Sequence, residues 1–295
     1  MVTLSGREET EAEAVTGKIS SGRLPLVPTR VDVRGRERQD GIADWVAEET
    51  PVAMVYNGIS YAVMMATPAD LENFALGFSL TEGIIKSPDE LFDIELSDSA
   101  EGITLDMRIA GERLAGLREQ RRNMAGRTGC GLCGTESLAQ AMRPIPWVGS
   151  PVSISDEAIQ YAIARLKAHQ PLQAETGATH AAAWCDLQGR ILVAREDVGR
   201  HNALDKLIGS QHASGGIFGE GFALISSRAS FEMVQKCAAV GIGCLVAVSA
   251  PTGLAIREAR KAGMILVGFA RPGRHVLYYS GAEPGNNESV REYSV

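Results

Sequence analysis

Two cysteines one helical turn apart carry the clearest chemistry in this sequence. Cys130 and Cys133 lie among glycines in the run 127–134 (RTGCGLCG), shortly after an arginine-rich stretch at 113–127. A thiol reacts as its thiolate, and its free pKa of about 8.5 falls beside cations, near helix N-termini and in Cys-x-x-Cys pairs. Residues 135–142 favour a helix whose N-terminus would lie near Cys133. The spacing predicts a nucleophilic sulfur in a mobile, glycine-rich loop.

Other interpretations of the pair stay open at this point. A single Cys-x-x-Cys can also be half of a zinc site, a redox disulfide, or two cysteines that are close in sequence by chance. Structural zinc takes four ligands, whereas Cys185, Cys237 and Cys244 form no second close pair. These three cysteines lie in apolar contexts and are most simply core residues. We therefore expect no metal site.

The 295-residue chain has the size and composition of a globular protein. Its apolar content of 45% can bury a substantial core. A formal charge of −7 and a pI near 5.4 argue against a general nucleic-acid binder. The sequence shows neither a long apolar run nor a secretory leader, and its five cysteines match no secreted disulfide framework. We expect a cytoplasmic protein that does not span a membrane.

The first part of the chain is predicted to be a small α+β domain, residues 29–143, that ends in the cysteine loop. Residues 1–28 lack apolar periodicity and are expected to form a flexible tail. Residues 52–56 and 59–65 flank an Asn-Gly dipeptide, which readily takes the positive φ angles of a type I′ turn. This pattern predicts a β-hairpin.

A helix and a further strand follow the predicted hairpin. Thr67 is expected to cap the helix, with Pro68 at its first position and Gly83 after its end. The apolar face of this helix should pack on the hairpin; its residues are Leu71, Phe74, Ala75 and Phe78. Alternating apolar residues over 103–109 predict the strand.

The second part, residues 144–295, is predicted to be an α/β domain that binds a cofactor. Ser155 can cap a helix, and residues 181–185 and 190–194 predict a hairpin. From Gly221 onward, short apolar strands alternate with helices, which is typical of a parallel sheet covered on both faces. The predicted strands are 222–226, 244–248 and 264–269, and the predicted helices are 231–240 and 254–262.

Three loops follow the carboxyl ends of those strands, where parallel sheets bind their ligands. They are residues 226–228, 249–252 and 270–274, and they offer hydroxyl and guanidinium groups that can hold phosphate. Capping and solvated arginines explain any one loop alone. The three together predict a nucleotide or pterin-nucleotide pocket, with Ser226 and Arg228 among its residues.

Residues 196–202 (EDVGRHN) contain more ionisable groups than a turn needs. His201 can exchange a proton near neutral pH, and Arg200 can pair with Asp197 or with a phosphate. A solvated turn explains the same residues. His180 presents a similar choice between capping and facing a ligand. We include His201 among the candidate cofactor-binding residues.

Several stretches together resemble the formate dehydrogenase accessory sulfurtransferase family, usually called FdhD, from about residue 30 to about residue 280. Their order and joint presence are highly specific, unlike the Cys-x-x-Cys alone. The stretches are 56–58 (YNG), 75–78 (ALGF), 81–85 (TEGII), 130–134 (CGLCG), 179–182 (THAA), 196–206 (EDVGRHNALDK) and 226–228 (SSR).

The resemblance implies a sulfurtransferase that takes persulfide sulfur from a cysteine desulfurase and passes it to the bis-molybdopterin guanine dinucleotide cofactor of formate dehydrogenase. It implies that Cys130 carries the persulfide, that Cys133 assists, and that GDP is a partial mimic of the cofactor. The implied cofactor-binding residues are Phe269, Ala270, Arg271, Pro272, Gly273 and Arg274. A cytoplasmic homodimer with a cytidine-deaminase-like α/β/α domain is also implied.

Zinc deaminase chemistry is not expected despite that implied fold. Zinc deaminases combine His-x-Glu with a later Pro-Cys-x-x-Cys. Here His180 is followed by Ala181 and Ala182, and the cysteine pair precedes the histidine. A non-catalytic chaperone of the molybdenum cofactor, or a zinc-binding module, remains the alternative function.

Overall fold

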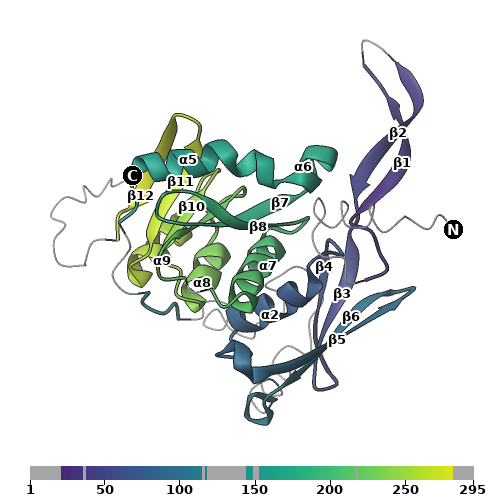
Figure 1. Cartoon of the computed structure of the whole chain (residues 1–295), viewed down its shortest axis with the longest axis horizontal. Helices are drawn as coiled ribbons and strands as arrows, with labels where there is room; N and C mark the ends of the chain where they lie inside the picture. The colour runs from purple at the N-terminus through teal and green to yellow at the C-terminus, as the bar shows by residue number, and fades with distance from the viewer. Residues whose placement is uncertain are drawn as a thin grey trace.

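The computed structural model describes residues 21–35, 38–114, 117, 144–148, 153–216 and 218–281. These residues form three sheets with helices around them (Figure 1). Most of the predicted tail and the whole predicted cysteine loop, with Cys130 and Cys133, lie outside the described residues. Within the described part, no helix combines the length and the apolarity that crossing a bilayer requires.

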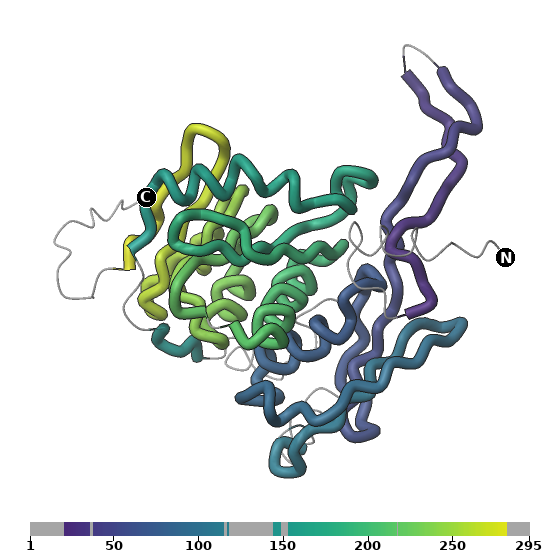
Figure 2. Tube along the Cα trace, in the orientation of Figure 1, coloured from purple at the N-terminus to yellow at the C-terminus, as the bar shows by residue number. Residues whose placement is uncertain are grey.

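A two-stranded antiparallel ribbon, β1 (Leu26–Val33) and β2 (Gln39–Ala47), projects from the body of the molecule (Figures 1 and 2). The sequence patterns did not predict this ribbon. Most of its side chains are exposed, so it lacks the alternation that marks a half-buried strand. Because β1 begins at Leu26, the end of the predicted 1–28 tail is in fact strand.

The four-stranded sheet contains the predicted hairpin, β3 (Thr50–Tyr56) and β4 (Ile59–Ala66), joined through Asn57 and Gly58 with φ angles of 47° and 76°. Its order is β4-β3-β6-β5. The predicted strand β6 (Gly102–Ile109) runs parallel to β3, and β5 (Leu91–Ser99) pairs with β6 after a 3₁₀ turn at Pro88–Glu90.

Helix α2 (Leu71–Thr81) confirms the predicted apolar face but corrects its predicted start. Leu71, Phe74, Ala75 and Phe78 are all buried. Thr67 does not cap the helix, because Asp70, with φ 53°, directly precedes it. The Thr67 hydroxyl instead accepts a hydrogen bond from the backbone N–H of Val198, 131 residues later in the chain.

The six-stranded sheet has the order β12-β11-β10-β9-β7-β8. As predicted, β9, β10 and β11 are parallel and β7 with β8 forms a hairpin. The final strand β12, antiparallel to β11, was not predicted. The strands are β7 (His180–Cys185), β8 (Ile191–Asp197), β9 (Phe222–Ile225), β10 (Cys244–Ala247), β11 (Ile265–Arg271) and β12 (Arg274–Tyr279).

Helices cover both faces of this sheet, which gives the α/β/α layering expected for the second part of the chain (Figure 1). Ser155 caps α5 as predicted, by accepting a hydrogen bond from Ala158 N–H at 3.2 Å. On one face lies α5 (Asp156–Leu166), followed by a 3₁₀ turn (Lys167–His169) and α6 (Pro171–Thr176). On the other face lie α7 (Arg200–Ala213), α8 (Phe231–Ala239) and α9 (Gly253–Ala262).

Helices α2 and α7 cross with their backbones in contact. A Cβ atom added to Gly77 would lie 1.8 Å from the carbonyl oxygen of Asp205, and one added to Gly209 would lie 1.9 Å from that of Asn73. Glycine is required at both positions because any side chain would overlap backbone atoms. The buried core is accordingly continuous from the four-stranded sheet through α2 and α7 to the six-stranded sheet.

Candidate functional site

The predicted ligand edge of the six-stranded sheet gathers residues from distant parts of the chain. The carboxyl ends of β9, β10 and β11 lie there because these strands are parallel. Since β7 is antiparallel to β9, the start of β7 lies at the same edge, where His180 pairs with Asp197 at the end of β8. The edge therefore joins the 196–202 turn to the three predicted loops.

Backbone hydrogen bonds tie these loops together. The N–H of Ser249 donates to the carbonyl of Ser227 at 3.4 Å, and the N–H of Phe269 donates to that of Ser249 at 3.1 Å. The N–H of Thr252 donates to the carbonyl of Ala229 at 3.0 Å. The sequence correctly predicted that the three loops share one edge, and the structure shows them side by side.

The 196–202 turn is held by a buried ion pair and by Thr67. Lys206 and Asp197 have fully buried side chains with Nζ 2.6 Å from Oδ2. Lys206 also donates to the carbonyl of Thr67 at 2.8 Å, while the N–H of Thr67 donates to Asp197 Oδ2 at 3.0 Å. Asn202 donates to Asp197 Oδ1 at 2.9 Å and to the carbonyl of Met65 at 2.8 Å. Asp197 is therefore committed to this framework and does not pair with Arg200.

Glu196, next to Asp197, fixes the opposite side of the turn. Its carboxylate accepts hydrogen bonds from the backbone N–H groups of Leu172 and Gln173 and from the Thr179 hydroxyl, each at 2.9 Å. Burial raises the pKa of Glu196, although all three bonds oppose that shift. Glu196 thereby anchors the N-terminus of α6 and the segment before His180.

Four ionisable residues at this edge take no part in the framework around Asp197 and Glu196. His201, in the first turn of α7, places Nε2 2.8 Å from Oε2 of Glu232 in the first turn of α8. The hydrogen bond from His201 is the main cause that lowers the pKa of Glu232. Burial, and then the charge of Arg200, lower the pKa of half-buried His180. Arg200 Nε is buried without a hydrogen-bond partner.

Three of these residues carry groups that can hold an anionic ligand. Arg200 supplies positive charge, and His180 and His201 supply imidazole nitrogens that can hydrogen-bond to it. Glu232 holds His201 in place. The sequence interpretation had included His201 among the site residues but had missed Glu232, whose only signal was its place in the first turn of a predicted helix.

The predicted residues of the loop after β9 have different roles. Ser226 Oγ accepts a hydrogen bond from Ala181 N–H at 2.9 Å, so this side chain ties β7 to β9. Its hydroxyl proton remains able to donate. Arg228 is exposed at the same edge and forms no ion pair with any residue that the structure describes. Thr252 caps α9 by accepting from Ala255 N–H at 3.2 Å.

The segment 269–274 forms the end of β11, a tight turn and the start of β12. Phe269 has a positive φ of 48° and is 37% exposed. A left-handed backbone at an aromatic residue costs on the order of 1–3 kcal/mol, and such strain is common at ligand sites. Arg271 and Arg274 pair across the strands, and both are exposed.

Ala270 is the one residue of this segment whose side chain is fully buried and so cannot contact a ligand. It has no exposed surface and packs in the cluster that contains Ile159 and Ile163 of α5. A ligand can reach only the backbone at this position. Alternate residues of a strand face opposite sides of the sheet, so Phe269 and Arg271 are exposed while Ala270 is buried.

The three described cysteines confirm the prediction that they are core residues. Cys185, Cys237 and Cys244 are free and fully buried, and burial raises the pKa of all three thiols well above the usual range. Such thiols are unreactive near neutral pH. Among the described residues, no group of three or more His, Cys, Asp or Glu side chains could hold a metal ion.

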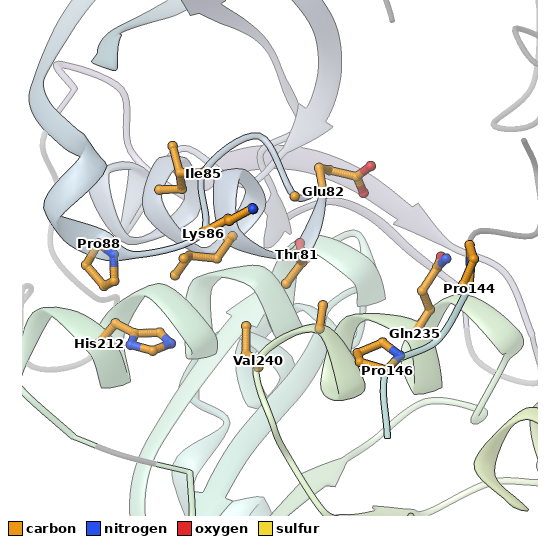
Figure 3. A pocket seen from close by; sticks show the side chains of 13 residues that line it. Thr81, Glu82, Ile85, Lys86, Pro88, Pro144, Pro146, His212, Gln235 and Val240 are labelled. Carbon is orange, nitrogen blue, oxygen red and sulfur yellow. The ribbon is translucent and has the colours of Figure 1, made fainter. Parts of the chain in front are cut away.

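A separate pocket of about 550 Å³ lies where α2, α7 and α8 end (Figure 3). Thr81 and Glu82 line one side, and His212 and Gln235 line the other. Pro144 and Pro146 also line it, and Pro144 follows Cys133 by eleven residues in the sequence. The pocket is not at the predicted ligand edge, since α7 and α8 both begin there and end here.

Comparison with known proteins identifies the family. Residues 47–284 match the FdhD/NarQ family, a range that includes both Cys130 and Cys133. The chain belongs to the FdhD/NarQ family. This membership confirms the resemblance inferred from the sequence motifs.

Similar FdhD/NarQ proteins are named sulfur carrier protein FdhD. One from Cupriavidus necator is 57% identical over 236 residues, which is 80% of this chain and 82% of that protein. Another from Bordetella petrii is 52% identical over 80% of this chain and 85% of that protein. A crystal structure described as a formate dehydrogenase accessory protein from Desulfotalea psychrophila is 25% identical, with a TM-score of 0.67 over 87% of this chain and 98% of that one.

Proposed function

We propose that this chain is a sulfur carrier that accepts persulfide sulfur on Cys130 and transfers it to the bis-molybdopterin guanine dinucleotide cofactor, an activity that formate dehydrogenase requires. The observation that carries the proposal is the family match across both cysteines, together with relatives that are named sulfur carriers. A cysteine desulfurase is the proposed donor and the formate dehydrogenase apoenzyme the final recipient. We propose a cytoplasmic homodimer.

In the loading step, the Cys130 thiolate attacks the terminal sulfur of the donor persulfide. A new sulfur–sulfur bond forms on Cys130, the donor's own sulfur–sulfur bond breaks, and the donor cysteine leaves as a thiolate. Cys133 has the spacing to attack the loaded Cys130, which would release hydrosulfide and leave a disulfide. We propose that Cys133 assists delivery when the cofactor is present.

The carboxyl edge of the six-stranded sheet is the proposed cofactor site. Arg271 and Arg274 are exposed there, and planar guanidinium groups can bind phosphate oxygens in bidentate fashion. Phe269 offers an exposed aromatic ring beside them. His201, Ser226 and Arg228 complete the proposed residues. This chemistry fits the pyrophosphate and the guanine of a guanine dinucleotide.

The test is mass spectrometry after incubation with a cysteine desulfurase and cysteine. We expect one extra sulfur on Cys130 of the wild type, none on the Cys130→Ala variant, and a retained load on Cys133→Ala. Cys185, Cys237 and Cys244 serve as internal controls because they are buried. If the Cys130→Ala variant still supports formate dehydrogenase activity, that result would contradict the carrier function and favour the non-catalytic chaperone.

A further inference from the structure

A side chain of α5 forms a hydrogen bond to the backbone of the turn between β11 and β12. Gln160 Oε1 accepts a hydrogen bond from the backbone N–H of Gly273 at 2.8 Å. Gly273 has a φ of 82° and follows Pro272, which is the sequence and geometry of a type II turn. Arg271 and Arg274 occupy the first and last positions of this turn.

Gln160 is itself held by a second hydrogen bond. Its Nε2 lies 2.9 Å from Nδ1 of His275, and Nε2 of His275 lies 3.0 Å from Oδ1 of Asp156. The His275 side chain is only 12% exposed. The result is a relay from Asp156 through His275 and Gln160 to the turn.

The donors and acceptors of this relay have only one consistent arrangement. A backbone N–H can only donate, so Gln160 must turn its oxygen to Gly273 and its amino group to His275. His275 Nδ1 must then accept, which leaves Nε2 as the ring nitrogen that donates. Its proton is donated to the carboxylate of Asp156. Both ends of the relay require the same tautomer.

This bond selects the orientation of one peptide plane. Type I and type II turns differ by a rotation of roughly half a turn of the central peptide, here Pro272–Gly273. Gln160 captures the Gly273 N–H and so favours the type II orientation. The carbonyl of Pro272 points the opposite way because a trans peptide is planar. Releasing the N–H would free that peptide to rotate between the two arginines.

We propose that Gln160 and His275 are positioning residues that hold Arg271 and Arg274 in the geometry that binds the pyrophosphate of a guanine nucleotide. The inference rests on the proposed cofactor site. Neither residue touches the ligand, since both act on the turn through the Gly273 N–H. Among the described residues, Asp156 is the charged group within hydrogen-bonding distance of His275.

The experiment compares Gln160→Ala, Gln160→Glu and the control Glu157→Gln, which alters an exposed position on the first turn of α5. Hydrogen exchange of the Gly273 amide is followed by NMR without nucleotide, and GDP affinity is measured by calorimetry. For Gln160→Ala we expect exchange several-fold faster and GDP affinity reduced about five- to tenfold, as for one lost hydrogen bond, with the thermal midpoint lowered by only a few degrees. The control should match the wild type.

Gln160→Glu should restore both properties. The new carboxylate keeps an oxygen that accepts from the Gly273 N–H, which is the contact that Gln160→Ala removes. A simple packing role would not show this rescue.

Two results would overturn the proposal. Unchanged Gly273 exchange in Gln160→Ala would show that the relay does not hold the turn, and faster exchange with unchanged GDP affinity would show that the turn does not position the arginines. A wild type that does not bind GDP would overturn the proposed cofactor site, while the exchange measurement would still decide the relay.

Discussion

The ammonium group of Lys206 lies 2.6 Å from the carboxylate of Asp197, and neither side chain has any exposed surface. Asp197 ends β8, whereas Lys206 lies in the second turn of α7. Thr67, from the segment after the β3–β4 hairpin, bonds to both residues. The pair thus fixes the turn that presents Arg200 and His201, and it links that turn to the first part of the chain.

Replacing Lys206 with methionine should destabilise the protein by about 3–5 kcal/mol, because it leaves a buried carboxylate without its partner. Chemical denaturation measures this change. The matched control is Arg190→Gln, which breaks the ion pair with Asp186 where the arginine is 67% exposed and should cost less than about 1 kcal/mol. If the two variants lose the same free energy of unfolding, the buried pair would contribute no more to stability than the exposed one.

Gly209→Ala should destabilise the protein even though alanine is ordinarily the better helix former by about 1 kcal/mol. The added Cβ would overlap the carbonyl of Asn73, so α2 and α7 would have to separate; overpacking of this kind costs about 1–3 kcal/mol or more. Gly111→Ala is the control, since nothing lies within 4 Å of its added Cβ. The midpoint of thermal unfolding should fall for Gly209→Ala. It should rise or stay unchanged for Gly111→Ala. A stabilised Gly209→Ala protein would show that the crossing is looser than described.

Stability should depend on Glu232 on the acid side of the pH range. Its pKa is lowered in the folded state, mainly by the hydrogen bond from His201. A depressed carboxyl pKa gives stability that is fully present above the unfolded value, about 4.3 for glutamate, and is lost as pH falls through the folded value. Glu232→Gln should therefore flatten the loss of stability below about pH 4.3. Denaturation series at several pH values test this, and an unchanged acid slope would exclude the coupling.

Arg271→Ala and Arg274→Ala should each weaken GDP binding by about 1.5–3 kcal/mol, as for a lost hydrogen bond to a charged group. Arg260→Ala is the control because it removes the same charge from the exposed C-terminal end of α9, away from the ligand edge. Persulfide loading of Cys130 should survive all three changes. Equal GDP affinity in Arg271→Ala and the wild type would remove the arginine from the site.

The parts of the fold that could be predicted are those in which burial leaves a pattern in the sequence. The helix from Ser155 and the parallel strands from residue 222 have strong apolar periodicity and were placed within one or two residues. The β1–β2 ribbon has most of its side chains exposed and leaves no such pattern. The wrong cap at Thr67 has another cause: its hydroxyl serves Val198, a partner 131 residues away that local rules do not consider.

The site shows the same division. The shared edge of the three loops follows from strand direction alone, so it was predictable. The pairing of His201 with Glu232 and the relay through Gln160 and His275 join residues 31 and 115 positions apart. Such pairs depend on how α7, α8, α5 and β12 pack, and that packing is not encoded in the spacing of the residues.

The glycine crossing of α2 and α7 also determines how the polypeptide could be divided. Helix α2 comes before the cysteine pair in the chain and α7 after it, and Phe74 and Leu204 from the two helices belong to one buried cluster. A chain cut between residues 114 and 144 would give two fragments that each expose half of this contact. The fragments should aggregate when expressed singly and reassemble when expressed together. Such a pair could serve as a split reporter, and its reassembly would require Gly77 and Gly209 at the crossing.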